Sequence, residues 1–140
     1  MKFLNALQPV GLLLLRAALA VIFISHGYPK LAHANSGMQA FFVQHGLPGY
    51  FTYVAGVVET FGGVLLLLGL FTRAAALLLA IEMCVAIWKV HSGGGYLAIR
   101  NYEFPMAVGA ACFALATVGA GLISLDHPLY AARGGGKPRR

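Results

Sequence analysis

Four long apolar runs constrain the fold of this chain more than any other feature of its sequence. They cover residues 9–28, 50–70, 72–91 and 102–123, each near the roughly 20 residues that a helix needs to cross a bilayer. None alternates polar and apolar residues with the period of two that marks a barrel strand. With 59% hydrophobic and only 10% charged residues, the chain has too little polar surface for a water-soluble domain. We therefore predict an all-α fold, a four-transmembrane-helix antiparallel bundle.

The basic residues predict how this bundle lies in the membrane. With four spans, both termini share one side with the turn between the second and third spans. That side carries Lys2, Arg73, Arg133, Lys137, Arg139 and Arg140. The other side carries Lys30, Lys89 and Arg100. Because Lys and Arg concentrate on the cytoplasmic side, we expect both termini in the cytoplasm and a multi-pass protein of the inner (plasma) membrane.

The chain divides into one membrane domain and a tail. Residues 1–128 form the bundle, and residues 129–140 are expected to be a disordered basic cytoplasmic tail. The net charge of +6 predicts contact with anionic membrane lipid. It does not indicate nucleic acid, because the tail is short and carries no interleaved aromatic residues.

Two further features of the runs matter. The N-terminus resembles a secretory signal, but Arg16 interrupts its apolar stretch and residues 21–24 continue that stretch, so an uncleaved first helix is the simpler interpretation. Cys84 and Cys112 both fall inside spans with no paired spacing, so whether they form a disulfide stays open.

The one long connection, residues 31–49, is predicted to contain a short helix. Asn35 or Ser36 can cap that helix at its start. Met38, Phe41 and Phe42 then fall on one apolar side. Such a segment is expected to lie as a flap in the membrane interface.

Glu59 stands near the middle of the second apolar run, where a charge costs about 2.5 to 3.5 kcal/mol. A partner would offset that cost. At about 1.5 Å per residue, Arg16, Glu82 and Glu59 lie about 12, 14 and 16 Å from the cytoplasmic ends of their helices. We predict that Arg16 lies between Glu59 and Glu82 in one buried charge layer, which is the candidate catalytic site. Small residues one turn from Glu59 predict close helix approach: Ala55, Gly56, Gly62 and Gly63.

A second group of polar and aromatic residues falls near the outer ends of the spans. It forms the candidate substrate-binding set: His26, Tyr28, Lys30, His91, Tyr102 and Glu103. The set has donors, acceptors and aromatic rings but no spacing typical of a metal site, so no metal is expected. Interfacial Tyr and Lys also anchor membrane proteins that have no site there.

In order along the chain, several segments resemble the DoxX family of small four-helix membrane proteins, which is related to DoxD. They are "ISHGYPKL" (24–31), "HGLP" (45–48), "GVVETFGGVLLLLGLFTRAAALLL" (56–79), "YE" (102–103) and "GAGLISLD" (119–126). Arg16 and Glu59 match the family's recurrent Arg and Glu. His26, Gly27 and Lys30 match its His-Gly-x-x-Lys segment, whereas Glu82 rests on the depth argument alone.

The resemblance covers nearly everything but the tails. It implies a plasma-membrane bundle that takes part in membrane redox work, with a thiosulfate:quinone oxidoreductase as the named example. The expected cofactor is a quinone. The sequence carries no nicotinamide or flavin fingerprint and no cysteine cluster for iron–sulfur. Electrons would therefore come from a soluble or membrane redox partner subunit, and whether the chain itself is an enzyme stays open.

Two other functions remain alternatives. His26 and His91 lie at similar depth on two spans and could hold a b-type haem, although the family resemblance does not imply one, so no haem is expected. A small carrier or a membrane scaffold that recruits soluble redox proteins is the non-enzymatic alternative, and a four-span carrier would work as a homo-oligomer. Hydrolysis is not supported, because no nucleophile elbow or phosphate-binding loop is present.

Overall fold

The computed structural model describes residues 2–33, 36–95 and 97–133, and these residues contain helices and no strand. The predicted all-α class is confirmed. The α-helices are α1 (Lys2–Ala32), α2 (Ser36–Gln44), α3 (Phe51–Leu68), α4 (Thr72–Ala86), α5 (Glu103–Val118) and α6 (Asp126–Arg133). Three short helical segments connect α4 to α5: the π-helix η1 (Ile87–His91) and the 3₁₀-helices η2 (Ser92–Gly94) and η3 (Ile99–Asn101).

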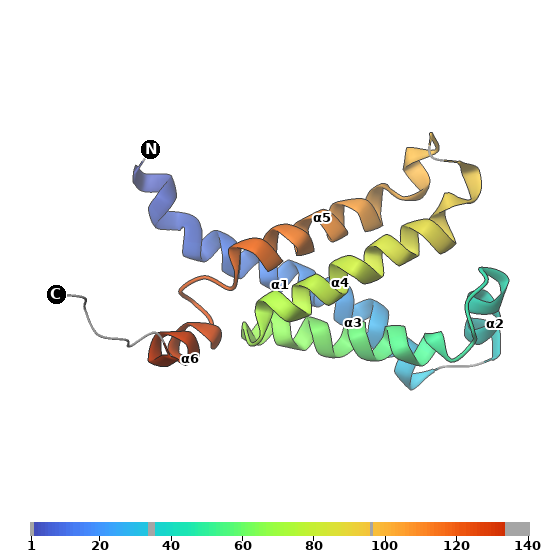
Figure 1. Ribbon diagram of the computed structural model, residues 1–140, viewed down its shortest axis with the longest axis horizontal. Coiled ribbons are helices and arrows are strands. Elements are labelled where there is room, and N and C mark those ends of the chain that lie inside the picture. Colours follow the sequence, from blue (N-terminus) through green and yellow to red (C-terminus); the bar gives the residue numbers. More distant parts are fainter. Residues whose placement is uncertain (1, 34–35, 96, 134–140) are drawn as a thin grey trace.

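The long helices pack as two pairs. Helix α1 lies along α3, α4 lies along α5, and the contact between α3 and α4 joins the pairs (Figure 1). Helix α2 lies at one end of the molecule, as does the connection from α4 to α5. The start of α1, the tight turn from α3 to α4 and helix α6 lie at the other end.

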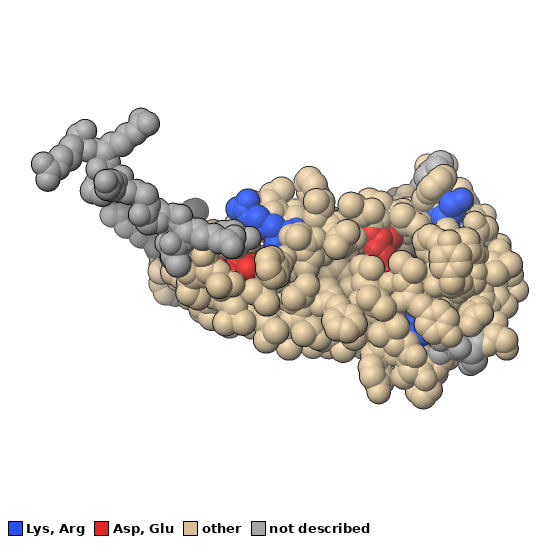
Figure 2. Space-filling model, turned by 60° about the horizontal axis from the view of Figure 1, so that its bottom comes forward, with Lys and Arg blue, Asp and Glu red and all other residues tan. Residues whose placement is uncertain are grey.

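The outer surface is apolar, as in a protein that contacts lipid. Helix α1, helix α3 and the segment Thr72–His91 are long and apolar enough to cross a membrane, and α5 is a shorter apolar helix. Large apolar side chains point outward from all four: Leu14, Phe61, Leu78 and Phe113. On one face, Lys, Arg, Asp and Glu appear only as a few separate spots (Figure 2). The chain is a membrane protein, because water-soluble proteins rarely expose so large an apolar surface.

Helix boundaries differ from the predicted runs. Helix α1 continues through Pro9 and Pro29 and has 31 residues, so it is about 46 Å long. The predicted fourth span, 102–123, is wrong at its end, because α5 stops at Val118. Gly119 (φ 93°) and Gly121 (φ 78°) follow it, and these left-handed conformations favour glycine and end the helix.

The predicted tail is wrong at its start. Residues 129–133 belong to α6, which begins at Asp126. Asp at the first position and Pro128 in the first turn are typical of a helix start. The remaining residues of the predicted tail, 134–140, lie outside the described residues.

Glycines let α3 approach both α1 and α4 closely, which confirms the predicted role of the small-residue stripe. A Cβ on Gly63 would lie 2.8 Å from Ile24 Cγ1 of α1. A Cβ on Gly62 would lie 3.1 Å from the Leu79 side chain of α4. Gly27 of α1 reciprocates, since a Cβ there would lie 2.6 Å from the backbone nitrogen of Thr60. Membrane helices use small residues in this way to bring their backbones together.

Candidate functional site

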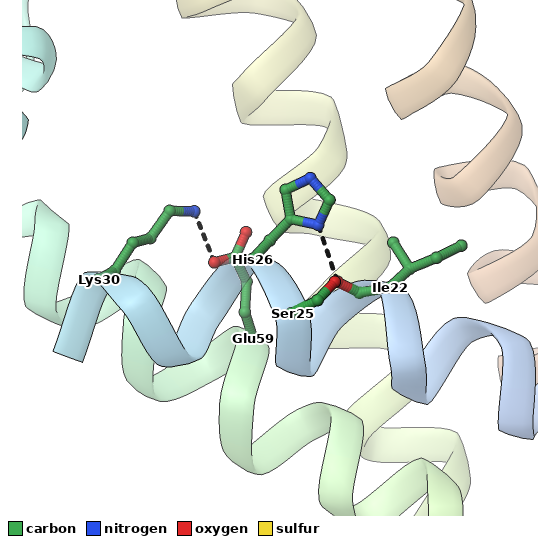
Figure 3. Close-up of polar contacts among 5 residues, drawn as sticks. All are labelled: Ile22, Ser25, His26, Lys30 and Glu59. Carbon is green, nitrogen blue, oxygen red and sulfur yellow. Dashed lines mark hydrogen bonds and ion pairs between the residues drawn. The ribbon is translucent and has the colours of Figure 1, made fainter. Parts of the chain in front are cut away.

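Glu59 of α3 is paired with Lys30 of α1. Lys30 Nζ lies 2.5 Å from Glu59 Oε2, and Glu59 is only 5% exposed. Figure 3 shows the two side chains meeting between their helices. Gly56 lies one turn before Glu59, and a Cβ there would lie 3.0 Å from Lys30 Cβ. The missing side chain at Gly56 therefore lets the lysine stem lie against α3 and reach the carboxylate.

Arg16 does not bridge Glu59 and Glu82, and the predicted three-residue charge layer is wrong in this respect. Its buried guanidinium donates to the carbonyl oxygens of Leu66 (2.9 Å) and Leu67 (3.1 Å) at the end of α3. It also donates to the carbonyls of Ala120 (3.0 Å) and Ile123 (2.6 Å) after α5. A helix end leaves its last carbonyls without intrahelical donors, and a cation there also meets the negative end of the helix dipole.

The error has a geometric cause. Depth was counted from the predicted cytoplasmic ends of the helices, as if those ends lay at one level. Helix α1 begins at Lys2, so that 14 residues precede Arg16, whereas α3 ends at Leu68. Arg16 is therefore level with the last turn of α3. Glu59 lies seven residues before Leu66 in the same helix, about 10 Å away along the axis.

Asp126 completes this end of the molecule, and the sequence analysis assigned it no role. Its carboxylate accepts hydrogen bonds from the backbone N–H groups of Phe71 (2.7 Å) and Thr72 (2.8 Å) at the start of α4. Its own backbone N–H donates to the Gly69 carbonyl (2.8 Å). A carboxylate stabilises a helix N-terminus. Its position at the start of α6, two residues before Pro128, was the available signal.

A cavity of about 560 Å³ lies at the other end, between α1, α2, α3, α4 and α5. Most of its walls are apolar, with Phe41, Phe42, Phe51 and Phe104 among them. The predicted helix in the long connection is confirmed as α2, and its Met38, Phe41 and Phe42 line this cavity. The cavity has the size and the mostly apolar lining of a small-molecule site.

Five predicted site residues converge on this cavity. They are His26 and Lys30 of α1, Glu59 of α3, Glu82 of α4 and His91 of η1. Tyr28, Tyr102 and Glu103 are not among the lining residues. The structure thus unites members of the two predicted groups, with Lys30 rather than Arg16 as the cation beside the glutamates.

Glu82 has an unusual environment for a carboxyl group. Its Oε2 atom is buried and has no hydrogen-bond partner among the described residues. Glu59 and Lys30 lie close enough for their charges to act on it. A buried polar atom without a partner costs free energy, so such an atom in a native protein needs an explanation. Since it lines the cavity, the simplest explanation is that it serves a ligand or a proton.

Both histidines are oriented by the backbone. His26 Nδ1 lies 2.8 Å from the carbonyl oxygen of Ile22 (Figure 3). His91 Nδ1 lies 3.0 Å from the carbonyl oxygen of Ala86, five residues earlier, in the π-helical turn. π-Helical turns often occur at functional sites. His26 is exposed and His91 partly buried, so the cavity carries one imidazole at its mouth and one on its α4 side.

Neither a metal cluster nor a disulfide marks this site. Within residues 2–33, 36–95 and 97–133, no group of three His, Cys, Asp or Glu side chains could hold a metal ion. Cys84 is exposed, Cys112 is buried, and both are free thiols.

Comparison with known proteins identifies the family. The DoxX family pattern matches residues 11–92, more than half of the chain. This chain belongs to the DoxX family. That segment contains His26, Lys30, Glu59, Glu82 and His91, so all five polar residues of the cavity lie within the DoxX match.

Several DoxX-like relatives match almost the whole chain. An uncharacterized protein of Haemophilus influenzae is 35% identical over 138 residues, covering 93% of this chain and 98% of the relative. The Bacillus subtilis protein named "Putative oxidoreductase CatD" is 32% identical over 133 residues, covering 95% and 97%. The Escherichia coli protein named "Inner membrane protein YphA" is 30% identical over 131 residues, covering 88% and 93%. No solved structure matches the chain.

Proposed function

We propose that this DoxX protein is the quinone-binding membrane subunit of an oxidoreductase. The observation that supports the proposal is the cavity of about 560 Å³, where five polar side chains meet largely apolar walls. An isoprenoid quinone needs an apolar slot for its ring and tail, polar contacts for its two ring oxygens and a route for protons. The printed name of the relative "Putative oxidoreductase CatD" agrees with this class of function.

The polar residues fit a quinone by their chemistry. The Lys30 ammonium has three N–H donors and gives one to Glu59, so others remain for a ring oxygen. Glu59 holds the lysine in place. The buried Glu82 Oε2, which has no partner among the described residues, can hold or release a proton. Phe42, Phe51 and Phe104 supply apolar and aromatic walls.

A bound quinone supplies two-electron redox chemistry: two electrons and two protons convert it to the quinol. The chain supplies binding, orientation and protons, with Glu82 next to the Lys30–Glu59 pair. The two electrons come from the reduced cofactor of a partner redox subunit, which is oxidised in the same step. Such a partner docks against the membrane subunit.

In this proposal all four long helices cross the inner membrane and both termini lie in the cytoplasm. Three helices have the required length, and α5 is the shorter fourth. The excess of Lys and Arg at the end with α6 and the α3–α4 turn supports the orientation. The E. coli relatives YqjF and YphA are named as inner membrane proteins. The cavity then lies toward the outer face.

Quinone binding is testable with purified protein from native membranes. We expect organic extracts to contain bound quinone, and expect added short-chain ubiquinone to bind. His26→Ala and Lys30→Ala should each weaken binding, since both residues line the cavity. His127→Ala is the matched control, because His127 lies at the other end, beside Asp126. An intact, folded preparation that binds no quinone contradicts the proposal.

One observation keeps a second candidate, a b-type haem. His26 and His91 line the same cavity, and the Nδ1 atom of each is engaged by a backbone carbonyl. The two Nε2 atoms would then hold the haem iron, which would supply one-electron redox chemistry. An absorption spectrum distinguishes the candidates, because a Soret band that disappears in both His26→Ala and His91→Ala would favour haem over quinone.

A further inference from the structure

The hydrogen-bonding groups of the cavity are strongly biased toward acceptors. Among the residues that the structure describes, 22 line the cavity, and these include no Ser, Thr, Tyr, Trp, Asn, Gln or Arg. The polar side chains are the two histidines, the two glutamates and Lys30. Which form of a ligand this set recognises depends on where each group carries its hydrogens.

Both histidines present an acceptor when the ring is neutral. The backbone carbonyls of Ile22 and Ala86 can only accept, so Nδ1 of His26 and of His91 must carry the hydrogen in these bonds. A neutral imidazole carries one N–H. The Nε2 atom of each ring is therefore a free lone pair, and neither atom has a hydrogen-bond partner within the described part of the chain.

Glu59 adds a further acceptor, and Glu82 adds one in its ionised form, whereas side-chain donors among the described lining residues are few. Glu59 accepts from Lys30 through Oε2. Glu82 Oε2 is buried without a partner in the described ranges. Within the described part of the chain and with both histidines neutral, Lys30 is the one lining residue with side-chain N–H groups to spare, and one of these is already engaged by Glu59. The cavity thus offers a ligand two imidazole nitrogens and a carboxyl oxygen as acceptors, but only one ammonium group, already partly engaged, as a donor.

This balance matches a ligand that donates two hydrogen bonds. A quinone has two carbonyl oxygens, which only accept, whereas the corresponding quinol has two hydroxyl groups, which donate. The acceptors also come from different helices, with His26 on α1 and with Glu82 and His91 on α4 and η1. We propose that the cavity binds the quinol form more tightly than the quinone. This inference rests on the function proposed above and specifies the redox form that the site prefers.

The preference has a redox consequence. When a site binds the reduced form more tightly, the bound couple accepts electrons more readily than the free couple. For a two-electron couple, each tenfold preference raises the potential by about 30 mV. One hydrogen bond gained on binding the quinol changes affinity by about tenfold. Two hydroxyl contacts would therefore raise the potential of the bound couple by about 60 mV.

The test compares the two redox forms of one ligand on the wild-type protein. Short-chain ubiquinone, and the same compound reduced to the quinol and kept anaerobic, are titrated separately into detergent-solubilised full-length protein. We expect the quinol Kd to be at least about tenfold lower. Equal affinities, or tighter binding of the quinone, overturn this inference and leave the proposed function in place. Failure of both forms to bind overturns the proposed function as well.

Two variants test which residues create the preference. Glu82→Gln replaces a carboxyl oxygen with an amide that also donates, and His91→Phe removes one lone pair at similar size. Both should weaken quinol binding by about tenfold and change quinone binding less. Glu103→Gln and His127→Phe are matched controls, because neither residue lines the cavity. Preserved quinol preference in a folded Glu82→Gln, His91→Phe double variant overturns the assignment of these acceptors.

Discussion

Buried charged side chains have different hydrogen-bond partners at the two ends of the bundle. At the end with the α3–α4 turn, Arg16 gives hydrogen bonds to four carbonyls and Asp126 accepts two from the backbone. At the cavity end, Lys30 and Glu59 hold each other, while Glu82 Oε2 and two histidine nitrogens have no partner in the described part of the chain. The two buried charged side chains of the first end are thus fully engaged by the backbone, whereas the cavity end keeps polar atoms without a partner in the described ranges.

This difference separates a structural role from a functional one. A buried charge whose hydrogen-bonding capacity is filled by the backbone has little left for a ligand, but it fixes where helices end and meet. Buried polar atoms with unused capacity contribute little to stability and can bind something else. Arg16 and Glu59 both belong to the residues that resemble the DoxX pattern, yet the structure places them in different ends with different tasks.

Arg16→Ala should have the largest effect on stability. It removes four hydrogen bonds from a buried cation and leaves the carbonyls of Leu66 and Ala120 without these donors. We expect a loss of about 3 to 5 kcal/mol, seen as a Tm in detergent that falls by roughly 10 °C or more. Arg73→Ala is the control, because Arg73 is exposed and its bond to Val118 O is long, at 3.4 Å. Similar losses of stability in both variants would show that the buried Arg16 stabilises the fold no more than the exposed Arg73.

The sequence predicted the elements of this molecule better than their relative heights. Apolar length and turn residues locate the helices, and a cap at Asn35 or Ser36 with the spacing of Met38, Phe41 and Phe42 predicted α2. The glycine stripe on α3 predicted close packing, since a glycine leaves room wherever the neighbour lies. These signals are local, so one sequence contains them.

Pairing of charges depends on axial offset, which no local signal gives. A shift of seven residues moves a side chain about 10 Å along a helix. The observed offset between α1 and α3 places Lys30, and not Arg16, beside Glu59. Carboxylates are also not the only acceptors that a buried arginine can use. The last carbonyls of α3 lack intrahelical donors, and Arg16 donates hydrogen bonds to them. The acceptor bias of the cavity depends on side-chain hydrogen bonds and could not be predicted.

Asp126→Ala tests the second buried charge at the end with the α3–α4 turn. The carboxylate holds two backbone N–H groups at the start of α4, so its loss should cost about 1 to 2 kcal/mol. Asp126→Asn should recover part of this loss, because its carbonyl oxygen can still accept one of the two bonds. Thermal unfolding of the three proteins in one detergent gives the order. An Asn variant no better than Ala would mean that the negative charge, and not the cap geometry, stabilises this turn.

The Lys30–Glu59 pair should show an intermediate effect, measured by a double-mutant cycle. Lys30→Met and Glu59→Gln each leave one partly or fully buried group unpaired, and the double variant removes both. We expect a coupling free energy of about 1 to 3 kcal/mol, so that the double variant is less destabilised than the sum of the singles. Lys89→Met is the control, because Lys89 lies over the Trp88 ring and outside the cavity. Additive losses would show that the short contact contributes no pairwise stabilisation.

Glu82→Gln should have the smallest effect on stability. It is also the sharpest test of the difference between the two ends, because it should affect binding more than folding. The Oε2 atom that it replaces has no hydrogen-bond partner among the described residues, so no bond to the protein is lost there. The substitution also replaces a carboxyl group that lies near Glu59 with a neutral amide of similar size. We expect Tm to change by no more than the equivalent of about 0.5 kcal/mol, while quinol binding weakens by about tenfold. A large loss of stability with unchanged binding would reverse the assignment, since Glu82 would then behave like Arg16. Stability and binding, measured on the same two variants, thus decide which end of the bundle maintains the fold and which end serves the ligand.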